Sequence, residues 1–561
     1  MDTMDFNTCP RLKKASKFSG EYRLDMFKVF TVGQGELFMR SLKIFLPQAE
    51  IKPVPREDAN IVITVSYAYS SENEYCYIRI TDCGIEIHCR DNAGARNAAA
   101  IIAQIIRTQE NGGFVLPCGV AEDWPDAQYR AMMLESSGRV WMPMNIIRRY
   151  IQEMALCRMN VLQFHFMEDS GCTVPFDSAP ELSGYGKENL KFTKDEVREM
   201  IAYAADLGIR VTPFVEVLSH ATDFAEKSGI GCPGDGGESM YDVCLGQEKT
   251  FEVIEKILTE ISELFPDDVI HIGADEYDMC RVTPWKPYWE KCPHCQELSR
   301  RMGYTSLREL FLYGIERINR IVNKLGKVMM MWNADIHPGH LPKEFERNMI
   351  IHYYRFCSDL GRERIYNLYL NGYIEDGFSA INSYYPQTYM DFDNYMSAEK
   401  LNGWSHLTGP LVKKENHAKL PGGCCCAWEE HEHYCRTIPA AIMLFADRLW
   451  NAYGDPVPYD EAYGRTMTHI LFGTKLPEDM NVFACLGGVL PPLKDNVAAH
   501  VERVEVGMDE LIRVKNMLRQ LTSEGDETAE IYADAIEKVI SEKLNEEQIT
   551  ESLKVPLPFE G

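Results

Sequence analysis

The sequence lacks the run of roughly 18 consecutive apolar residues that a membrane-spanning helix needs. Its opening stretch, MDTMDFNTCPRLKKASKFSG, also lacks the apolar segment of a secretory signal. Positive charge is scarce, because 58 Lys and Arg stand against 84 Asp and Glu, for a formal net charge of −26. A phosphate-binding surface needs clustered Lys and Arg. We therefore expect a cytoplasmic protein that binds neither nucleic acid nor a membrane.

The N-terminal part of the chain shows alternating patterns typical of short strands. The 561 residues, 45% of them hydrophobic, are enough for a large core and predict about two to four domains. CYIRITDCGIEIHCRD places apolar residues at every second position on either side of a turn at residues 82–84. The Ala-rich stretch NAGARNAAAIIAQIIRT then predicts one helix. These patterns indicate a small α+β domain over residues 1–125.

The middle of the chain alternates buried strands with amphipathic helices. NVLQFHF is almost continuously apolar, as a parallel strand covered on both faces would be. In the next helix, Thr193 and Glu196 have capping-box spacing and Gly208 supplies the stop. The unit recurs through IRVTPFVEV, VIHIGADE, KVMMMWNAD and GGCCCAW. This repetition favours a (β/α)8 barrel of the TIM type over residues 126–455, rather than a doubly wound sheet.

The last part of the chain reads as helical. HVERVEVGMDELIRVKNMLRQL and YADAIEKVISEKL are amphipathic, with charged faces that suit solvent. We expect residues 456–561 to form a helical C-terminal extension that packs on the barrel or on the second copy of a homodimer.

Two adjacent acids, Asp275 and Glu276, end the apolar run VIHIGADE. In a barrel, the carboxyl ends of the strands carry the active site. Neighbouring positions on a strand point in opposite directions, so one acid can face a reacting bond while the other contacts a different part of the substrate. Position alone fits equally well a pair of acids that caps the following helix.

HIGADE resembles the H-x-G-(G/A)-D-E signature of glycoside hydrolase family 20, the β-N-acetylhexosaminidases. Further blocks agree in order: EDWPDAQYRAMMLE, MNVLQFHFMEDSG, EVLSHA and WEEHEHYCRTIPAAIMLFADRLWN, so that the resemblance covers residues 75–451. It implies a (β/α)8 barrel and an exo-acting, retaining glycosidase that removes terminal β-linked GlcNAc or GalNAc from a glycan or glycoconjugate. In this family the sugar's own 2-acetamido oxygen attacks the anomeric carbon, an exception to the two-carboxylate scheme that requires no cofactor.

The resemblance also implies roles for five side chains. Glu276 would protonate the leaving oxygen and later activate water, which requires a raised carboxyl pKa. Asp275 would orient the acetamido N–H and offset the charge of the oxazolinium intermediate. Tyr389 would donate its hydroxyl hydrogen to the acetamido oxygen. His220 would stand behind the general acid, with Asp169 as its acidic partner. Without the resemblance, His220 and Tyr389 would be read as structural residues.

Five more positions match residues that bind the sugar. Asp391 and Glu430 correspond to acids that accept hydrogen bonds from outer hydroxyl groups. Trp332 and Trp428 correspond to aromatic walls that cover C–H faces of a pyranose. Arg139 is the candidate clamp for O3 and O4.

The chain departs from the family pattern in two places. LESSGRVW replaces L-D-x-x-R, so Glu135 stands where an aspartate is usual and Arg139 comes one position late. FHFMEDSGC lacks both tryptophans of W-H-L-T-D-D-Q-G-W. These departures concern the shape of the pocket and the preference beyond the terminal sugar. Three alternatives stay open: a lacto-N-biosidase, a GalNAc-specific glycosidase of the same family, or a catalytically silent barrel that binds amino sugars.

Cysteine is plentiful, with 18 in the chain. WEKCPHCQ holds the pair Cys292 and Cys295 at C-x-x-C spacing, with Cys280 upstream, and this is half of a typical thiolate zinc site. A fourth ligand could come from His294, Cys244 or the segment CCCAWEEHEHYC. A disulfide and free thiols are the other two readings. Catalysis itself is expected to need no metal.

Overall fold

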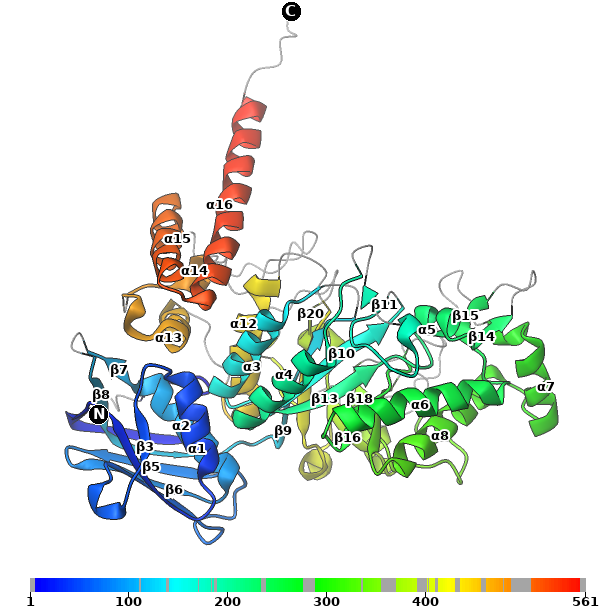
Figure 1. Cartoon of the computed structure of the whole chain (residues 1–561), viewed down its shortest axis with the longest axis horizontal. Coiled ribbons are helices and arrows are strands. Elements are labelled where there is room, and N and C mark those ends of the chain that lie inside the picture. The colour runs from blue at the N-terminus through cyan, green and yellow to red at the C-terminus, as the bar shows by residue number, and fades with distance from the viewer. Residues whose placement is uncertain are drawn as a thin grey trace, which may run out of the picture.

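Figure 1 shows the computed structural model of the chain, in which two sheets and a group of C-terminal helices can be followed. The structure describes residues 6–109, 112–137, 141–169, 171–182, 184–185, 189–233, 239–275, 288–333, 336–354, 370–390, 401, 403–408, 412–428, 434–455, 461–477, 479–485 and 506–554. No helix in this part of the chain has the length and apolar character that crossing a bilayer requires.

The first sheet has eight strands, with two helices packed on it. Its order is β1 (Lys14–Leu24), β8 (Phe114–Asp123), β5 (Cys76–Thr81), β6 (Gly84–Cys89), β4 (Ile61–Val65), β2 (Phe27–Val32) and β3 (Ile51–Pro53), with β7 (Arg107–Thr108) on β8. The predicted hairpin is β5–β6, paired antiparallel from Cys76 opposite Cys89 to Thr81 opposite Gly84. The predicted Ala-rich helix is α2 (Asn92–Ile105), capped by Asp91. The sequence patterns missed α1 (Glu36–Phe45), a short amphipathic helix without a side-chain N-cap.

The second sheet closes into a barrel of eight parallel strands, which confirms the predicted fold class. Around the wall they are β9 (Tyr129–Glu135), β10 (Val161–Glu168), β13 (Arg210–Val215), β16 (Val269–His271), β17 (Val328–Trp332), β18 (Ile350–Tyr353), β19 (Ser379–Asn382) and β21 (Gly422–Ala427). The last strand pairs with the first, from Gly422 opposite Tyr129 to Ala427 opposite Leu134, and closure leaves the barrel without a free edge.

Helices surround the barrel and continue beyond it. They are α3 (Met144–Leu156), α4 (Lys194–Asp206), α5 (Thr222–Lys227), α6 (Glu248–Leu264), α7 (Pro293–Met302), α8 (Leu307–Lys324), α9 (Leu370–Glu375), α10 (Tyr385–Thr388) and α12 (Tyr434–Trp450). The capping box of Thr193 and Glu196 forms as predicted at the start of α4. Gly208, with φ of 67°, follows the end of the same helix. The backbone signals in this segment therefore gave both ends of the helix correctly.

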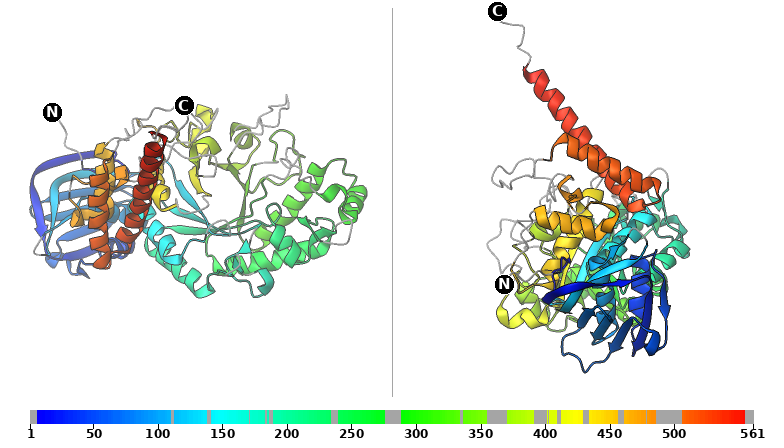
Figure 2. Two further views of the ribbon diagram at one scale, coloured as in Figure 1. Left: turned by 90° about the horizontal axis from the view of Figure 1, so that it is seen from above. Right: turned by 90° about the vertical axis from the view of Figure 1, so that its left-hand side faces the viewer.

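Within the described residues, four helices follow the barrel. These are α13 (Glu461–Phe472), α14 (Val482–Cys485), α15 (Met508–Ser523) and α16 (Glu527–Lys554). The helix α16 contacts α12 of the barrel, and the turn after α13 contacts β7 of the first sheet. Figure 2 shows these C-terminal helices, in orange and red, from two further sides. The predicted domain limits at 125/126 and 455/456 stay predictions, as does the homodimer.

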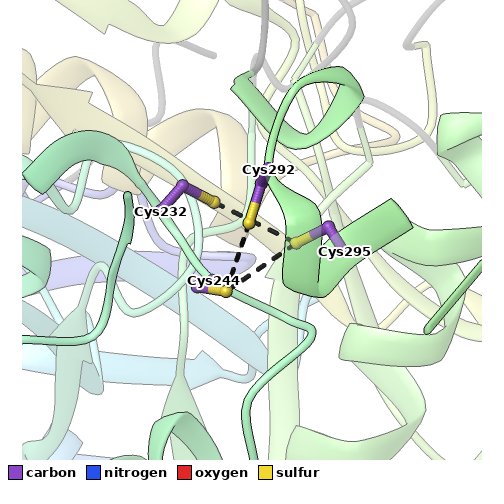
Figure 3. A group of neighbouring side chains, drawn as sticks. All are labelled: Cys232, Cys244, Cys292 and Cys295. Carbon is purple, nitrogen blue, oxygen red and sulfur yellow. Dashed lines mark hydrogen bonds between the residues drawn. The ribbon is translucent and has the colours of Figure 1, made fainter. Parts of the chain in front are cut away.

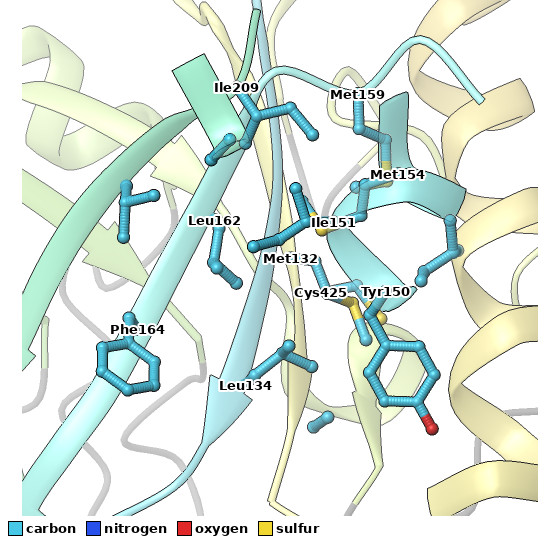
Figure 4. Packing of buried hydrophobic residues seen from close by; sticks show 14 of the residues in the cluster. Met132, Leu134, Tyr150, Ile151, Met154, Met159, Leu162, Phe164, Ile209 and Cys425 are labelled. Atoms are coloured by element: carbon cyan, nitrogen blue, oxygen red, sulfur yellow. The ribbon is translucent and has the colours of Figure 1, made fainter. Parts of the chain in front are cut away.

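Side chains of the barrel strands alternate between two cores. Met132 of β9 lies in the cluster that also holds Ile151 and Met154 of α3, on the outer side of the wall (Figure 4). Its neighbours Ala131 and Met133 belong to a separate cluster inside the barrel. Because every such residue is fully buried, truncation of one of these large side chains should cost about 2–5 kcal/mol. Packing on both faces holds the strand ends, and hence the site, in fixed positions.

Candidate active site

The described candidate residues lie at or just beyond the carboxyl ends of barrel strands. Asp169 directly follows β10, and His220 lies between β13 and α5. Asp275 comes shortly after β16, and Trp428 directly follows β21. Tyr389 opens the short strand β20 (Tyr389–Met390), which pairs with the end of β21 through Cys426. The fold therefore brings together residues that are far apart in the sequence.

An acid, a histidine and a second acid form a chain of contacts. Asp169 Oδ2 lies 2.9 Å from His220 Nδ1, a hydrogen-bond distance, and His220 Nε2 lies 3.9 Å from Asp275 Oδ2. The other Asp169 oxygen accepts hydrogen bonds from the backbone N–H and the hydroxyl of Thr222, at 3.0 and 2.7 Å. Burial alone would raise the pKa of Asp169, but the bonds from His220 and Thr222 lower it to about 2. Asp169 is thus a fixed anion that orients the His220 ring toward Asp275.

A third acid, Glu216, lies beneath the backbone that leads to Asp275. Glu216 Oε2 accepts a hydrogen bond from the backbone N–H of Ala274, at 3.1 Å. Burial is the main cause that raises the pKa of Glu216 well above its usual value, and the nearby Asp275 carboxylate adds to it. Gly273 and Ala274 both have positive φ, of 68° and 67°. Sequence reasoning missed Glu216, although it is the one acid in the apolar run IRVTPFVEV.

Aromatic rings fill the inner side of the same strand ends. The ring centroid of Tyr389 lies 6.1 Å from that of Trp332 and 6.3 Å from that of Trp428, and Tyr354 stacks on Tyr389 at 6.1 Å. Burial is the main cause that raises the pKa of Tyr389, and the charge of Asp275 is one of the lesser causes. The charge of Asp275 thus contributes to the environment of the Tyr389 hydroxyl.

Trp332 is the most deeply buried tryptophan of this aromatic group. Its side chain is fully buried and stacks on His352, with ring centroids 3.9 Å apart. Among the described residues its indole N–H finds no hydrogen-bond acceptor. A buried donor without a partner costs about 1–3 kcal/mol. Such groups are uncommon in native proteins, so this indole N–H needs an explanation.

Several predicted residues lie outside the described part of the chain. For the site these are Arg139, Glu276, Asp391 and Glu430, and for the metal hypothesis it is Cys280. The structure thus describes the predicted residues Asp169, His220, Asp275, Trp332, Tyr389 and Trp428.

The fold and the site together define a (β/α)8-barrel protein with acids and aromatic rings gathered at the face where barrel enzymes hold their active sites. A family model described as "Glycosyl hydrolase family 20, catalytic domain" matches residues 128–450, more than half of the chain. The chain therefore belongs to glycosyl hydrolase family 20.

Individual relatives agree with this assignment. The chain is 27% identical over 386 residues to a beta-hexosaminidase of Vibrio furnissii, a match that covers 62% of this chain and 59% of the relative. It is 24% identical over 403 residues to the human beta-hexosaminidase subunit beta, covering 67% of this chain and 66% of the relative. The match therefore spans about three fifths to two thirds of the length of these relatives.

Solved structures share the fold. A β-N-acetylhexosaminidase of Bacteroides fragilis superposes with a TM-score of 0.71 at 22% identity, covering 83% of this chain and 95% of that one. A GH20 exo β-N-acetylglucosaminidase of Vibrio harveyi, solved in complex with N-acetylglucosamine, gives 0.67 at 19% identity, covering 81% and 76%.

Proposed function

We propose that the protein is an exo-acting β-N-acetylhexosaminidase that removes terminal β-linked GlcNAc or GalNAc from glycans with retention of anomeric configuration. Membership of family 20 supports this proposal, as do the relatives named beta-hexosaminidase. The observation that carries it is the contact chain from Asp169 through His220 to Asp275, set beside Tyr389. The carboxylate of Asp275 and the buried hydroxyl of Tyr389 suit the polarised acetamido group of the substrate better than they suit a sugar without that group.

In the proposed first step, the acetamido oxygen forms a bond to the anomeric carbon while the bond from that carbon to the leaving oxygen breaks. Glu276 gives its proton to the leaving oxygen. The product is a cyclic oxazolinium ion, whose positive charge Asp275 offsets while it accepts a hydrogen bond from the acetamido N–H. Tyr389 donates its hydroxyl hydrogen to the acetamido oxygen and so fixes that oxygen for attack.

In the proposed second step, water attacks the anomeric carbon and gives a proton to Glu276. The bond from the carbon to the acetamido oxygen breaks, and the acetamido group returns to its first form. Two inversions at the same carbon leave the configuration unchanged. His220 and Asp169 act as positioning residues, because His220 contacts Asp275 and Asp169 holds His220.

Arg139, Asp391 and Glu430 would hold the outer hydroxyl groups of the sugar, and Trp428 would cover one of its faces. The buried indole N–H of Trp332, which lacks an acceptor among the described residues, lies in the same aromatic group and offers a donor to a bound substrate. No metal or organic cofactor takes part in either step.

Hydrolysis of three p-nitrophenyl glycosides tests the proposal: β-GlcNAc, β-GalNAc and β-glucoside. We expect turnover of one or both N-acetyl substrates, with retention seen by NMR, and little turnover of the glucoside. Equal rates on the glucoside would contradict the acetamido-assisted mechanism. Binding of N-acetylglucosamine without turnover of any substrate would instead support the silent amino-sugar-binding barrel.

A further inference from the structure

Four cysteine side chains from three separate segments meet on one side of the barrel (Figure 3). Cys232 lies in β14 (Gly231–Pro233), and Cys244 directly follows β15 (Ser239–Val243). Cys292 is the N-cap of α7, and Cys295 lies in the first turn of that helix. All four side chains are fully buried.

The sulfur atoms are spaced as the corners of a tetrahedron. Cys244 Sγ lies 3.6 Å from Cys292 Sγ and 3.9 Å from Cys295 Sγ, and Cys232 Sγ lies 4.0 Å from Cys295 Sγ. All four lie within 4.8 Å of one another. A zinc ion with four sulfurs at about 2.3 Å requires sulfurs about 3.8 Å apart. A disulfide needs about 2.05 Å between two sulfurs, so these contacts are not disulfides.

The backbone around the cysteines fits a metal knuckle. Cys295 donates its backbone N–H to the sulfur of Cys292, so the turn between the two cysteines is closed on itself. The chain after Cys244 passes directly against this turn: a Cβ atom at Gly246 would lie 2.2 Å from the carbonyl carbon of His294 and 2.6 Å from the Cys295 nitrogen. Only glycine permits this approach, which brings Cys244 to the C-x-x-C pair.

The ligand set is distinctive within the described residues. Two other groups of possible metal ligands there offer three side chains each, whereas this one offers four thiols. Four thiolates at tetrahedral spacing are typical of zinc, and iron is the other metal that takes this ligand set. Cys244 was one of the sequence-based options for a further ligand, and Cys232 was not recognised.

We infer that Cys232, Cys244, Cys292 and Cys295 bind one structural zinc ion. The four thiolates fill the tetrahedral positions and leave none for water or substrate, so the ion has no catalytic role. The site fastens the β14–β15 hairpin, which follows His220 and α5, to the start of α7, which follows the segment after Asp275. Zinc therefore joins the two loop regions that contribute the His220–Asp275 contact.

Metal analysis of the purified full-length protein tests this inference independently of its enzymatic activity. After expression in zinc-supplemented medium, we expect about one zinc per chain by inductively coupled plasma mass spectrometry. The double variant Cys292→Ser/Cys295→Ser should lose nearly all of it. The matched control Cys89→Ser, which removes a buried thiol from the first sheet, should keep it. Wild-type protein without zinc, or with iron in its place, would overturn the inference, as would zinc retained by the double variant.

A second measurement uses only the wild-type protein, in case the double variant fails to fold. X-ray absorption at the zinc edge should give a shell of four sulfurs at about 2.3 Å. A shell dominated by nitrogen or oxygen would contradict the cysteine site, even if the protein carried stoichiometric zinc. An inactive protein with a four-sulfur shell would sustain the zinc site while removing the proposed hexosaminidase function.

Discussion

The carboxylate of Glu216 occupies the space that a Cβ atom at Gly273 would need. Such an atom would lie 1.6 Å from Glu216 Oε2 and 2.0 Å from the carboxyl carbon, and Gly273 has φ of 68°. A glycine is therefore needed at position 273 for two reasons: the backbone has a positive φ, and the Glu216 carboxylate leaves no room for a side chain. Through this contact, Glu216 sets the position of the backbone that carries Asp275.

Replacement of Gly273 by alanine should destabilise the protein more than the backbone conformation alone explains. We expect Gly273→Ala to lower the free energy of unfolding by more than about 2 kcal/mol, as strain and overlap add. Gly303→Ala is the matched control, because Gly303 has a similar φ of 71° with no atom within 4 Å of the added Cβ. It should cost about 1 kcal/mol. Urea denaturation measures both, and equal losses would remove the role assigned to Glu216.

The raised pKa of Glu216 predicts a pH-dependent stability difference. The folded state favours the protonated carboxyl, so its contribution is fully present below the unfolded pKa of about 4.5 and is lost as pH rises toward the higher folded pKa. Glutamine stays neutral at every pH. Glu216→Gln should therefore gain stability relative to wild type above pH 4.5, by up to about 1.4 kcal/mol per pH unit. Parallel curves of melting temperature against pH would contradict the shifted pKa.

Charge at Asp275 should matter for turnover, on the proposed mechanism. Asp275→Asn should lower kcat on p-nitrophenyl β-GlcNAc by about 10²–10³, because it removes the anion that offsets the developing positive charge. Asp268→Asn is the control, since Asp268 is exposed at the opposite end of the same strand. It should retain wild-type kcat. A nearly neutral effect at Asp275 would refute its role.

A buried ion pair links the first sheet region to the barrel. Arg130 of β9 donates to both carboxylate oxygens of Glu74, at 2.6 and 3.1 Å, and it has no exposed surface. Burial opposes ionisation of Glu74. Arg130 and the other residues that interact with the Glu74 carboxylate nevertheless keep the pKa of Glu74 below its usual value. Arg130→Met should cost about 3–5 kcal/mol, because it leaves a buried charge without its partner.

An exposed ion pair on α4 serves as the control for the buried pair of Arg130 and Glu74. Arg198 and Asp195 lie 2.7 Å apart on α4, with 60% and 85% of their side chains exposed. Arg198→Met should change the free energy of unfolding by less than about 1 kcal/mol. The double variant Glu74→Gln/Arg130→Met should recover part of the loss seen with Arg130→Met alone. Denaturant unfolding of the four proteins would contradict the argument if the buried and exposed variants behaved alike.

Features encoded locally could be predicted from the sequence. Period-two alternation gave the β5–β6 hairpin, near-continuous apolar runs gave strands of the barrel, and the capping box of Thr193 with Glu196 gave the start of α4. The family resemblance suggested that Asp169 and His220 belong together, and they lie at hydrogen-bond distance. The roles proposed for the site residues stay predictions.

Features that depend on strand register could not be predicted. Glu216 contacts Ala274 because β13 and β16 align Phe214 with His271, and nothing in either segment specifies that alignment. Cys232 is a lone cysteine in its segment, so no spacing rule points to it. Its relation to Cys295 arises only when the β14–β15 hairpin meets the start of α7.

The pairing of β21 with β9 has a consequence for biosynthesis. One of the two partners of the first barrel strand is made last, because residues 422–427 follow residues 129–135 by most of the barrel's length. While the chain is emerging from the ribosome, β9 therefore presents an unpaired edge to other nascent chains. Aggregation during translation should therefore increase with the time that separates the synthesis of β9 from that of β21.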